Sequence, residues 1–417
     1  MALRLYQGLG YLVMPWLRLS ARLRSGYDQR TLRTPPPRAD LWIQAASVGE
    51  AYLARELVKR LEPVSPTTVL LTTNTSQGLA ILKEIKEEFS AGPLQLRLAY
   101  CPFDQPSLMA RALTLIQPRL VVLLESELWP GLMAGCKKEG VKLLVINGRM
   151  TENSLRHYQR WPAIWRDLRP SAIMAMSEAD SRRFAALFGA DIVETMANIK
   201  FDRIHSQATK EGQADNPLLH IIPPDEQFVV LGSIRQEEEE AVAKLLAHLC
   251  RKNPRLLIAL FPRHLHRLDH WQKHLTGRNL TWQLRSQCRV KVKPGTVILW
   301  DTMGELERAY ALARAAFVGG SLAPVGGHNF LEPLGCGIRP VIGPHWENFS
   351  WIGRGLIAQG LVHEAQNWQG VARYLLEEVQ GRPDRRQTKE ALHEFVRHRQ
   401  GGAQRACQKI KGMLAQP

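Results

Sequence analysis

At 417 residues, with 45% hydrophobic and 23% charged residues, the chain has the composition of a folded globular protein with room for two domains. Its 55 Lys and Arg residues exceed its 39 Asp and Glu residues, and the net charge of +16 favours an acidic partner such as a phosphorylated substrate or an anionic membrane. The basic residues are spread along the whole chain without an RNA- or DNA-binding signature, so we expect no nucleic-acid partner. The six cysteines form no C-x-x-C pair, which indicates reduced thiols and excludes a disulfide framework.

The first 38 residues predict a membrane anchor followed by a linker. The segment Leu5–Leu17 is apolar and aromatic, but it is shorter than the roughly 20 residues that a bilayer-spanning helix needs. Arg18, Arg22 and Arg24 follow at once. We therefore expect a helix that lies in the membrane interface while its arginines bind anionic lipid, with the rest of the chain in the cytoplasm. The alternative is an N-terminal helix packed on its own domain. The run Thr34–Pro37 predicts a stiff spacer.

From residue 39 to residue 205, strands alternate with helices, which predicts a Rossmann-like α/β domain with a parallel sheet. The expected strands are Leu41–Ala46, Thr68–Thr73, Arg97–Tyr100, Arg119–Leu124, Lys142–Ile146 and Ile173–Met176. The polar residues that follow these strands are Glu50, Glu125, Glu127 and Arg149. Because ligands bind beyond the carboxyl ends of strands in open parallel sheets, these residues predict a site in the first half of the chain.

Residues 206–417 repeat this alternation and predict a second Rossmann-like domain, to which we assign the C-terminal helices. The expected strands are Gln227–Leu231, Leu256–Phe261, Val297–Leu299, Ala315–Val318 and Arg339–Ile342. The polar residues that follow them are Arg263, Glu305, Asn329 and Glu332. Two such domains facing each other would bring both sets of strand ends to one cleft.

The stretch Val318–Pro333 (VGGSLAPVGGHNFLEP) predicts a phosphate-binding turn between a buried strand and a helix that Asn329 can cap. Its two glycine pairs are Gly319-Gly320 and Gly326-Gly327. Glycines let the backbone approach a ligand, and a helix start offers unpaired N–H groups to an anion. Plain glycine turns are the alternative. An esterase is disfavoured, because Ala323 replaces the last glycine of a G-x-S-x-G motif.

Four histidines lie close together in the second half, at His264, His266, His270 and His274. No carboxylate or cysteine completes a set of zinc ligands at this spacing. A solvated basic face is therefore favoured over a metal site, and we predict no metal and no other cofactor.

Eight motifs follow one another in an order that resembles the bacterial 3-deoxy-D-manno-octulosonic acid (Kdo) transferases of lipopolysaccharide assembly. They are AASVGE (Ala45–Glu50), ESELWP (Glu125–Pro130), NGRMTENS (Asn147–Ser154), NIKFD (Asn198–Asp202), PRH (Pro262–His264), DTMGEL (Asp301–Leu306), the glycine stretch Val318–Pro333 and GPHWENF (Gly343–Phe349). The similarity covers nearly the whole chain, including the apolar N-terminus. It implies a GT-B fold, with an acceptor-binding domain over residues 39–205 and a CMP-sugar-binding domain over residues 206–417.

The resemblance also implies an inverting, metal-independent transfer of Kdo from CMP-Kdo to the tetraacyldisaccharide 1,4'-bisphosphate precursor of lipid A, at the cytoplasmic face of the inner membrane. Glu50 matches the family's general base, and Glu125 and Lys200 match its transition-state stabilisers. The residues that match the family's CMP contacts are Pro262, Arg263, Met303, Gly304, Glu305, Asn329, Phe330, Leu331 and Glu332. Candidate contacts with acceptor or donor are Ser47, Gly49, Glu127, Arg149, Gly326 and Gly327.

The chain departs from the family pattern at two places. Gln44 stands where the family usually has His, and GSIRQEE (Gly232–Glu238) stands for its S-T-H-E-G-E-E segment, with the differences at Ile234–Gln236. Neither departure touches Glu50 or the CMP segments, so the expected activity is retained. Two alternatives stay open. One is a GT-B glycosyltransferase or epimerase that uses a nucleoside-diphosphate sugar, and the other is a membrane-bound binding protein without activity.

Overall fold

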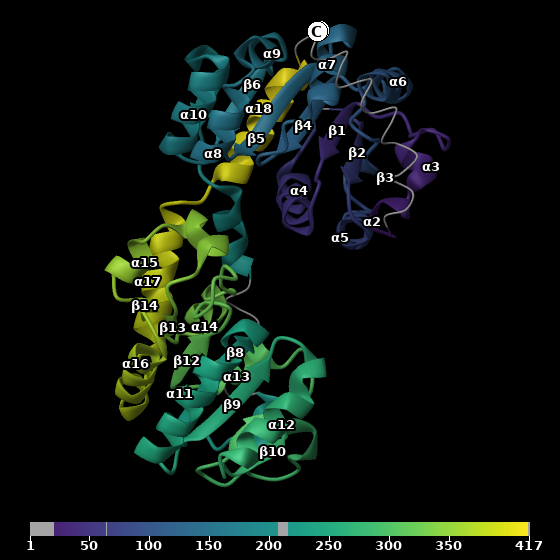
Figure 1. Ribbon diagram of the computed structural model, residues 1–417. Coiled ribbons are helices and arrows are strands. Elements are labelled where there is room, and N and C mark those ends of the chain that lie inside the picture. Colours follow the sequence, from purple (N-terminus) through teal and green to yellow (C-terminus); the bar gives the residue numbers. More distant parts are fainter. Residues whose placement is uncertain (1–20, 64, 207–215, 416–417) are drawn as a thin grey trace. The chain divides into compact units, whose positions relative to one another are not determined.

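The computed structural model describes residues 21–63, 65–206 and 216–415 (Figure 1). The expected anchor helix Leu5–Leu17 lies outside these residues. The chain divides into two compact units, which we call unit 1 (residues up to Arg203, with the segment from Arg399 onward) and unit 2 (Ile204–His398). Among the described helices, none combines the length and the apolar character that a membrane span requires.

Unit 1 is built on a sheet of seven parallel strands in the order β3-β2-β1-β4-β5-β6-β7. The strands are β1 (Leu41–Gln44), β2 (Thr67–Thr73), β3 (Leu94–Tyr100), β4 (Leu120–Leu124), β5 (Lys142–Gly148), β6 (Ala172–Ala175) and β7 (Val193–Thr195). All five residues of β4 are buried, as expected for a parallel sheet that is covered on both faces. The strand order reverses between β1 and β4, which is where open α/β sheets bind their ligands.

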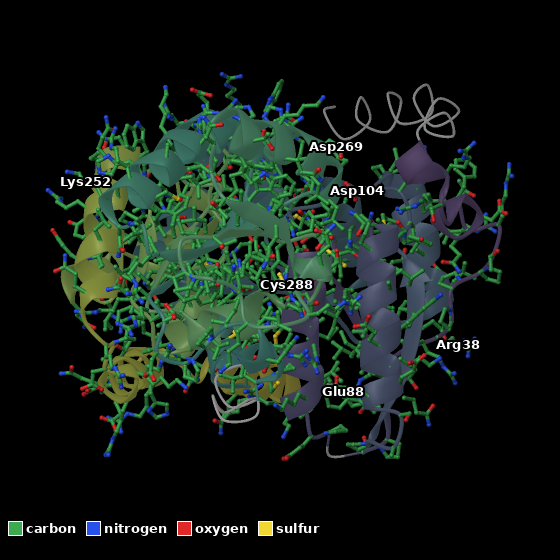
Figure 2. The ribbon with its side chains drawn as sticks, turned by 90° about the horizontal axis from the view of Figure 1, so that it is seen from below. Arg38, Glu88, Asp104, Lys252, Asp269 and Cys288 are labelled. Carbon is green, nitrogen blue, oxygen red and sulfur yellow. The ribbon has the colours of Figure 1, made fainter. Side chains whose placement is uncertain are left out.

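Helices cover both faces of the unit 1 sheet. The helices are α2 (Ala21–Arg24), α3 (Tyr27–Arg30), α4 (Val48–Arg60), α5 (Ser76–Glu88), α6 (Pro106–Ile116), α7 (Pro130–Glu139), α8 (Glu152–Tyr158), α9 (Pro162–Asp167), α10 (Glu178–Phe188) and α18 (Gly402–Ala415). Alternate residues of β4 point to opposite faces, so Val122 packs with α4, α5 and α18, while Val121 packs with α6, α7 and α10. Asp104, labelled in Figure 2, accepts hydrogen bonds from Gly131 N and Leu132 N at 2.9 and 2.8 Å and so fixes the start of α7.

Unit 2 contains a second sheet of seven parallel strands, in the order β10-β11-β9-β8-β12-β13-β14. The strands are β8 (Phe228–Ile234), β9 (Leu257–Pro262), β10 (Trp282–Leu284), β11 (Val297–Leu299), β12 (Ala315–Val318), β13 (Pro340–Ile342) and β14 (His363–Glu364). The order reverses between β8 and β12. The sequence therefore predicted the central strands of both sheets, but it missed β7, β10 and β14, which have two or three residues each and lie at or next to a sheet edge.

The helices of unit 2 also lie on both faces of its sheet. They are α11 (Glu239–Lys252), α12 (Leu268–Gly277), α13 (Leu306–Leu312), α14 (Leu331–Gly335), α15 (Gly355–Ala358), α16 (Trp368–Gln380) and α17 (Arg385–Arg397). One core layer joins α11, α12 and α16 to Val229 and Leu231 of β8. The opposite layer joins α13 to Phe228 and Val230 of the same strand. Two Rossmann-like units in one chain are the α/β architecture that the sequence predicted.

The C-terminal helix corrects one prediction, because α18 belongs to unit 1 rather than to the second domain. The Asp202 carboxylate accepts hydrogen bonds from Gly401 N and Ala403 N, both at 2.7 Å, and so caps the start of α18. Ala406 and Ile410 of this helix are buried in the same core layer as α4. The expected division lay after residue 205, whereas the compact units divide after Arg203.

Candidate active site

Glu50 lies in the first turn of α4, directly after the carboxyl end of β1. Its carboxylate accepts hydrogen bonds from Ala46 N at 2.6 Å and from the Ser47 hydroxyl at 3.1 Å. Ser47 is also the N-cap of α4, since its hydroxyl accepts from Glu50 N at 3.3 Å. These three contacts fix the orientation of a side chain that is only 5% exposed.

Burial, together with the negative charges of Glu127 and Glu125, raises the pKa of Glu50 to about 8, against the hydrogen bonds from Ala46 and Ser47, which lower it. Burial and the charge of Glu125 also raise the pKa of Glu127. The structure therefore brings Glu50, Glu125 and Glu127 within electrostatic range of one another, at the point where the strand order of unit 1 reverses. A buried carboxyl group with a pKa near neutral can exchange a proton with a substrate, which is what a general base requires.

Glu125 follows β4 in the left-handed backbone region, at φ 57°, and its backbone N–H donates to Ile146 O of β5 at 3.0 Å. A non-glycine residue rarely adopts this conformation, so the turn rather than the strand sets the direction of the side chain. The strand ends at Leu124, so the alternation of side chains between the two faces of a strand does not extend to Glu125 and Glu127.

Lys200 forms an ion pair with Glu125, with Nζ 2.6 Å from Oε1, and the two side chains are 20% and 16% exposed. Lys200 belongs to the 3₁₀ segment Ile199–Ser206. That segment is held to the sheet because Ile199 N donates to the Asn147 side chain at 3.0 Å, at the end of β5. The motifs that contain Glu125, Asn147 and Lys200 therefore meet at one edge of the sheet.

Gln44, which departs from the family pattern, is fully buried on β1. Its side-chain oxygen accepts from the Thr72 hydroxyl, and its amide donates to the Asn74 side chain at 3.3 Å. The Thr72 hydroxyl in turn accepts from the Trp42 indole N–H at 2.7 Å. Gln44 thus joins β1 to the end of β2 behind the Ser47–Glu50 turn, which explains how the chain accommodates an amide at this position.

The residues predicted to bind CMP lie at the ends of three strands of unit 2, which are the neighbours β11 and β9 and, on the other side of β8, β12. Pro262 ends β9, and Arg263 follows it with its backbone N–H donating to Ile234 O at 2.8 Å. Met303, Gly304 and Glu305 follow β11, whereas Asn329, Phe330, Leu331 and Glu332 follow the long turn after β12. Because parallel strands have their carboxyl ends at one edge, these segments share that edge of the sheet.

Glu305 makes its contacts inside unit 2. Its carboxylate accepts from Arg285 at 2.9 Å, from the Trp300 indole N–H at 2.9 Å and from the Thr302 hydroxyl at 2.6 Å. Burial opposes ionisation, but these hydrogen bonds and the Arg285 charge prevail and lower the pKa of Glu305. Its carboxylate therefore orders the loop that carries Gly304, while Met303 beside it is exposed.

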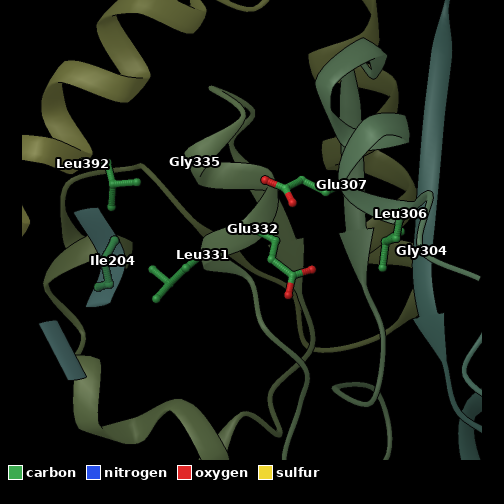
Figure 3. A pocket seen from close by; sticks show the side chains of 8 residues that line it. All are labelled: Ile204, Gly304, Leu306, Glu307, Leu331, Glu332, Gly335 and Leu392. Atoms are coloured by element: carbon green, nitrogen blue, oxygen red, sulfur yellow. The ribbon is translucent and has the colours of Figure 1, made fainter. Parts of the chain in front are cut away.

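A pocket of about 240 Å³ in unit 2 contains three of the residues that were predicted to bind CMP (Figure 3). It is lined by Ile204, Gly304, Leu306, Glu307, Leu331, Glu332, Gly335 and Leu392. Glu332 accepts from the Asn329 amide at 3.0 Å, and its burial raises its pKa, with the Glu307 charge adding to the effect. Leu392 comes from α17, far along the chain, so nothing in the local sequence marked it as a pocket residue.

The glycine stretch differs from the expected phosphate-binding turn. The Glu238 carboxylate accepts hydrogen bonds from Gly320 N at 2.5 Å and Leu322 N at 3.1 Å, so a side chain of the protein occupies two backbone N–H groups of the turn that was predicted to approach a ligand. The helix after the turn also has fewer residues than expected, and it begins one residue further along the chain than a helix capped by Asn329 would. It is the five-residue α14, which begins at Leu331 with Phe330 as its N-cap, although the Asn329 side chain does accept from Leu331 N at 3.2 Å.

The remaining candidate contacts lie at the expected edges. Gly49 stands in the first turn of α4, and Arg149 follows the end of β5. Gly326 and Gly327 both have positive φ, at 89° and 76°, which side-chain-bearing residues rarely adopt. Among the described residues, no three His, Cys, Asp or Glu side chains converge as metal ligands, and His270 of the histidine cluster instead contacts Glu239 at 3.0 Å.

Comparison with known proteins identifies the family. The family of 3-deoxy-D-manno-octulosonic-acid transferases (kdotransferases) matches residues 19–203. The chain is 31% identical to the 3-deoxy-D-manno-octulosonic acid transferase of Bordetella pertussis, over 98% of this chain and 97% of that protein. The chain belongs to this family. The Kdo transferase of Haemophilus influenzae is similar too, with 29% identity over 97% of this chain and 94% of the relative.

Membership of the Kdo transferase family makes the chain a glycosyltransferase. The UDP-GlcNAc 2-epimerase of Neisseria meningitidis, solved with UDP-GlcNAc bound, also matches in structure, with a TM-score of 0.55 over 90% of this chain and 100% of that one. The identity is only 13%, so this likeness concerns the fold alone and supports the arrangement of two Rossmann-like domains that the GT-B type shares.

Proposed function

We propose that this Kdo transferase moves Kdo from CMP-Kdo to the phosphorylated disaccharide precursor of lipid A, with inversion and without a metal ion. The observation that carries the proposal is the Glu50 carboxyl group, which is buried at the strand-order reversal of unit 1 with a pKa of about 8. In this proposal, unit 1 binds the acceptor and unit 2 binds the CMP moiety.

Glu50 takes the proton from the attacking sugar hydroxyl of the acceptor. The hydroxyl oxygen forms a bond to the anomeric carbon of Kdo while the bond from that carbon to the phosphate oxygen breaks, and the electron pair leaves with CMP. Attack opposite to the leaving group inverts the anomeric centre. The hydrogen bonds from Ala46 N and the Ser47 hydroxyl hold the Glu50 carboxylate in place for this transfer.

Glu125 and Lys200 act on the charges that develop in the transition state. The anomeric carbon gains positive character, which a carboxylate stabilises, and the departing phosphate gains negative charge, which an ammonium group offsets. The 2.6 Å ion pair keeps the two groups aligned before the substrates bind.

The charge of the whole chain fits an anionic, membrane-bound acceptor. A net charge of +16 attracts the two phosphates of the lipid A precursor and the anionic lipid around it. We propose that the chain works at the cytoplasmic face of the inner membrane, attached without spanning it.

Product analysis tests this function. The intact chain is incubated with CMP-Kdo and the tetraacyl bisphosphate acceptor, and the lipid product is analysed by mass spectrometry. The proposal predicts a lipid heavier by whole Kdo units together with free CMP. A nucleoside-diphosphate sugar that is consumed in place of CMP-Kdo would refute it in favour of the alternative donor class, and CMP binding without turnover would favour the inactive binding protein.

A further inference from the structure

Basic side chains gather at the strand-order reversal of unit 2, between β8 and β12. Arg263 is already a candidate CMP contact, whereas the proposed function assigns no role to Arg235 or to His328. Arg235 follows β8, and Arg263 follows the neighbouring β9. Two backbone N–H groups at this place are already bound, since Glu238 accepts from Gly320 N and Leu322 N. An anion at this edge cannot use these two groups, so side chains are the candidates to hold it.

His328 lies against the first glycine turn. Its backbone N–H donates to Gly319 O at 3.1 Å, and its Cδ2 atom would be only 2.8 Å from a Cβ atom at Gly320. Gly320 also has φ 68°, so it is needed both for the turn and for the close approach of the imidazole. The Nε2 atom of His328 is buried and has no hydrogen-bond partner among the residues that the structure describes. Buried polar atoms are normally paired, so this nitrogen keeps an unused hydrogen-bonding capacity that a ligand could take.

The surroundings of His328 are cationic. Burial, together with the charges of Arg263, Arg235 and His264, lowers the pKa of His328 to about 4. The ring is therefore neutral at pH 7 and can donate one N–H without adding to the positive charge, while the arginines supply the attraction for an anion. Arg235 also approaches the Gly320 turn, with its Cγ atom 3.5 Å from the same Cβ position.

We propose that His328 is a donor-binding residue, whose Nε2 atom donates a hydrogen bond to an anionic oxygen in a subsite completed by Arg235 and Arg263. This inference rests on the proposed function for the identity of the ligand. CMP-Kdo carries two groups of the required chemistry, the phosphate and the carboxylate of the sugar.

Two substitutions separate a ligand contact from a purely structural histidine. His328→Gln places a terminal amide N–H near the position of Nε2, whereas His328→Asn ends near Nδ1 and cannot reach it. Exposed His220 provides a control, as His220→Ala removes an imidazole elsewhere in unit 2. Dissociation constants are measured by calorimetry for CMP, cytidine and UDP, together with KM and kcat for CMP-Kdo and the melting temperature of each variant.

If His328 binds the phosphate, His328→Asn weakens CMP by roughly 10- to 100-fold, as expected for a lost hydrogen bond to a charged group, while cytidine binding stays unchanged. His328→Gln and His220→Ala then bind CMP with a dissociation constant within about threefold of that of the intact chain, which is less than the roughly tenfold change that the loss of such a bond causes. If His328 binds the carboxylate, CMP binding is unchanged and the KM for CMP-Kdo rises in His328→Asn alone.

Three results would overturn the inference. The first is that His328→Asn and His328→Gln have the same affinity for CMP and the same KM for CMP-Kdo. The second is that His328→Asn loses cytidine and CMP binding to the same extent, which would make His328 a structural support of the turn. The third is that the intact chain binds neither CMP nor UDP, which would refute both the anion subsite and the proposed donor. If it binds UDP and not CMP, the proposed function fails, but a loss of UDP binding in the Asn variant alone still supports the anion subsite.

Discussion

Glu50 gives the sharpest prediction, because its protonation links activity to stability. Burial and neighbouring carboxylates raise its pKa from 4.5 to about 8. A shift of this size corresponds to about 5 kcal/mol between the two protonation states. Below pH 4.5 the folded and unfolded chains both carry the proton. Between pH 4.5 and about 8 only the unfolded chain loses it, so the stability of the wild type falls as the pH rises, and above this window the contribution is constant.

Glu50→Gln removes this titration and supplies the reference. We expect the free energy of unfolding of the wild type, measured with urea and relative to Glu50→Gln, to fall by several kcal/mol and at most about 5 kcal/mol between pH 4.5 and pH 9. The amide meets two hydrogen-bond donors, Ala46 N and the Ser47 hydroxyl, and can accept from only one side. The protonated wild-type carboxyl at the acid end also has a single accepting oxygen, and its O–H can donate to the Ser47 hydroxyl as the amide N–H can. The variant should therefore match the wild type within about 1 kcal/mol at the acid end and be the more stable protein at the alkaline end.

The same titration controls the rate. With a pKa of about 8, roughly one tenth of the free enzyme holds the ionised base at pH 7, so kcat/KM for CMP release should rise about tenfold between pH 7 and pH 9. Glu50→Gln should lack this rise. A rate that is flat over this range, or a stability difference between the two proteins that does not vary with pH, would refute the assignment of Glu50 as a buried base.

Further predictions concern contacts that position the site. Lys200→Met and Glu125→Gln each leave one member of the ion pair without its partner. We therefore expect urea unfolding of the double variant to show a loss of unfolding free energy that is smaller, by about 1 kcal/mol or more, than the sum of the losses in the two single variants. Losses that are simply additive would contradict the ion pair. Asp202→Ala should lower the free energy of unfolding by about 2 kcal/mol and make α18 accessible to limited proteolysis. Asp384→Ala removes the exposed cap of α17 and should leave α18 protected. Glu238→Gln places an amide donor against backbone N–H groups and should lower the free energy of unfolding by about 1–3 kcal/mol, and an unchanged melting temperature would show that these bonds do not hold the glycine turn.

Much of the fold was accessible from the sequence, because buried parallel strands are short apolar runs and their carboxyl ends carry the polar residues. Residues 119–124 predicted β4 in this way, and Glu125 directly after them marked the edge of the sheet that carries the site. The edge strands β10 and β14 were missed because so few residues carry no clear pattern.

Contacts between distant parts of the chain could not be predicted in the same way. The C-terminal helix follows unit 2 in sequence, yet the Asp202 cap and the burial of Ile410 hold it on unit 1. Nothing in the sequence around Glu238 marks its carboxylate as a partner of the glycine turn, and only the fold places it against Gly320 N. The pKa of Glu50 likewise depends on burial and on Glu127, neither of which the motif around Glu50 specifies.

The most direct test of Glu50 as the base of a Kdo transfer is the rate of CMP release from CMP-Kdo, measured with and without the tetraacyl acceptor for the wild type and for Glu50→Gln. We expect the wild type to release CMP only when the acceptor is present. In Glu50→Gln the rate of release should be lower by about a hundredfold or more, while CMP binding is unchanged. Release that is absent from the wild type, or that proceeds equally fast in the variant, would contradict the claim that Glu50 is the base of a Kdo transfer.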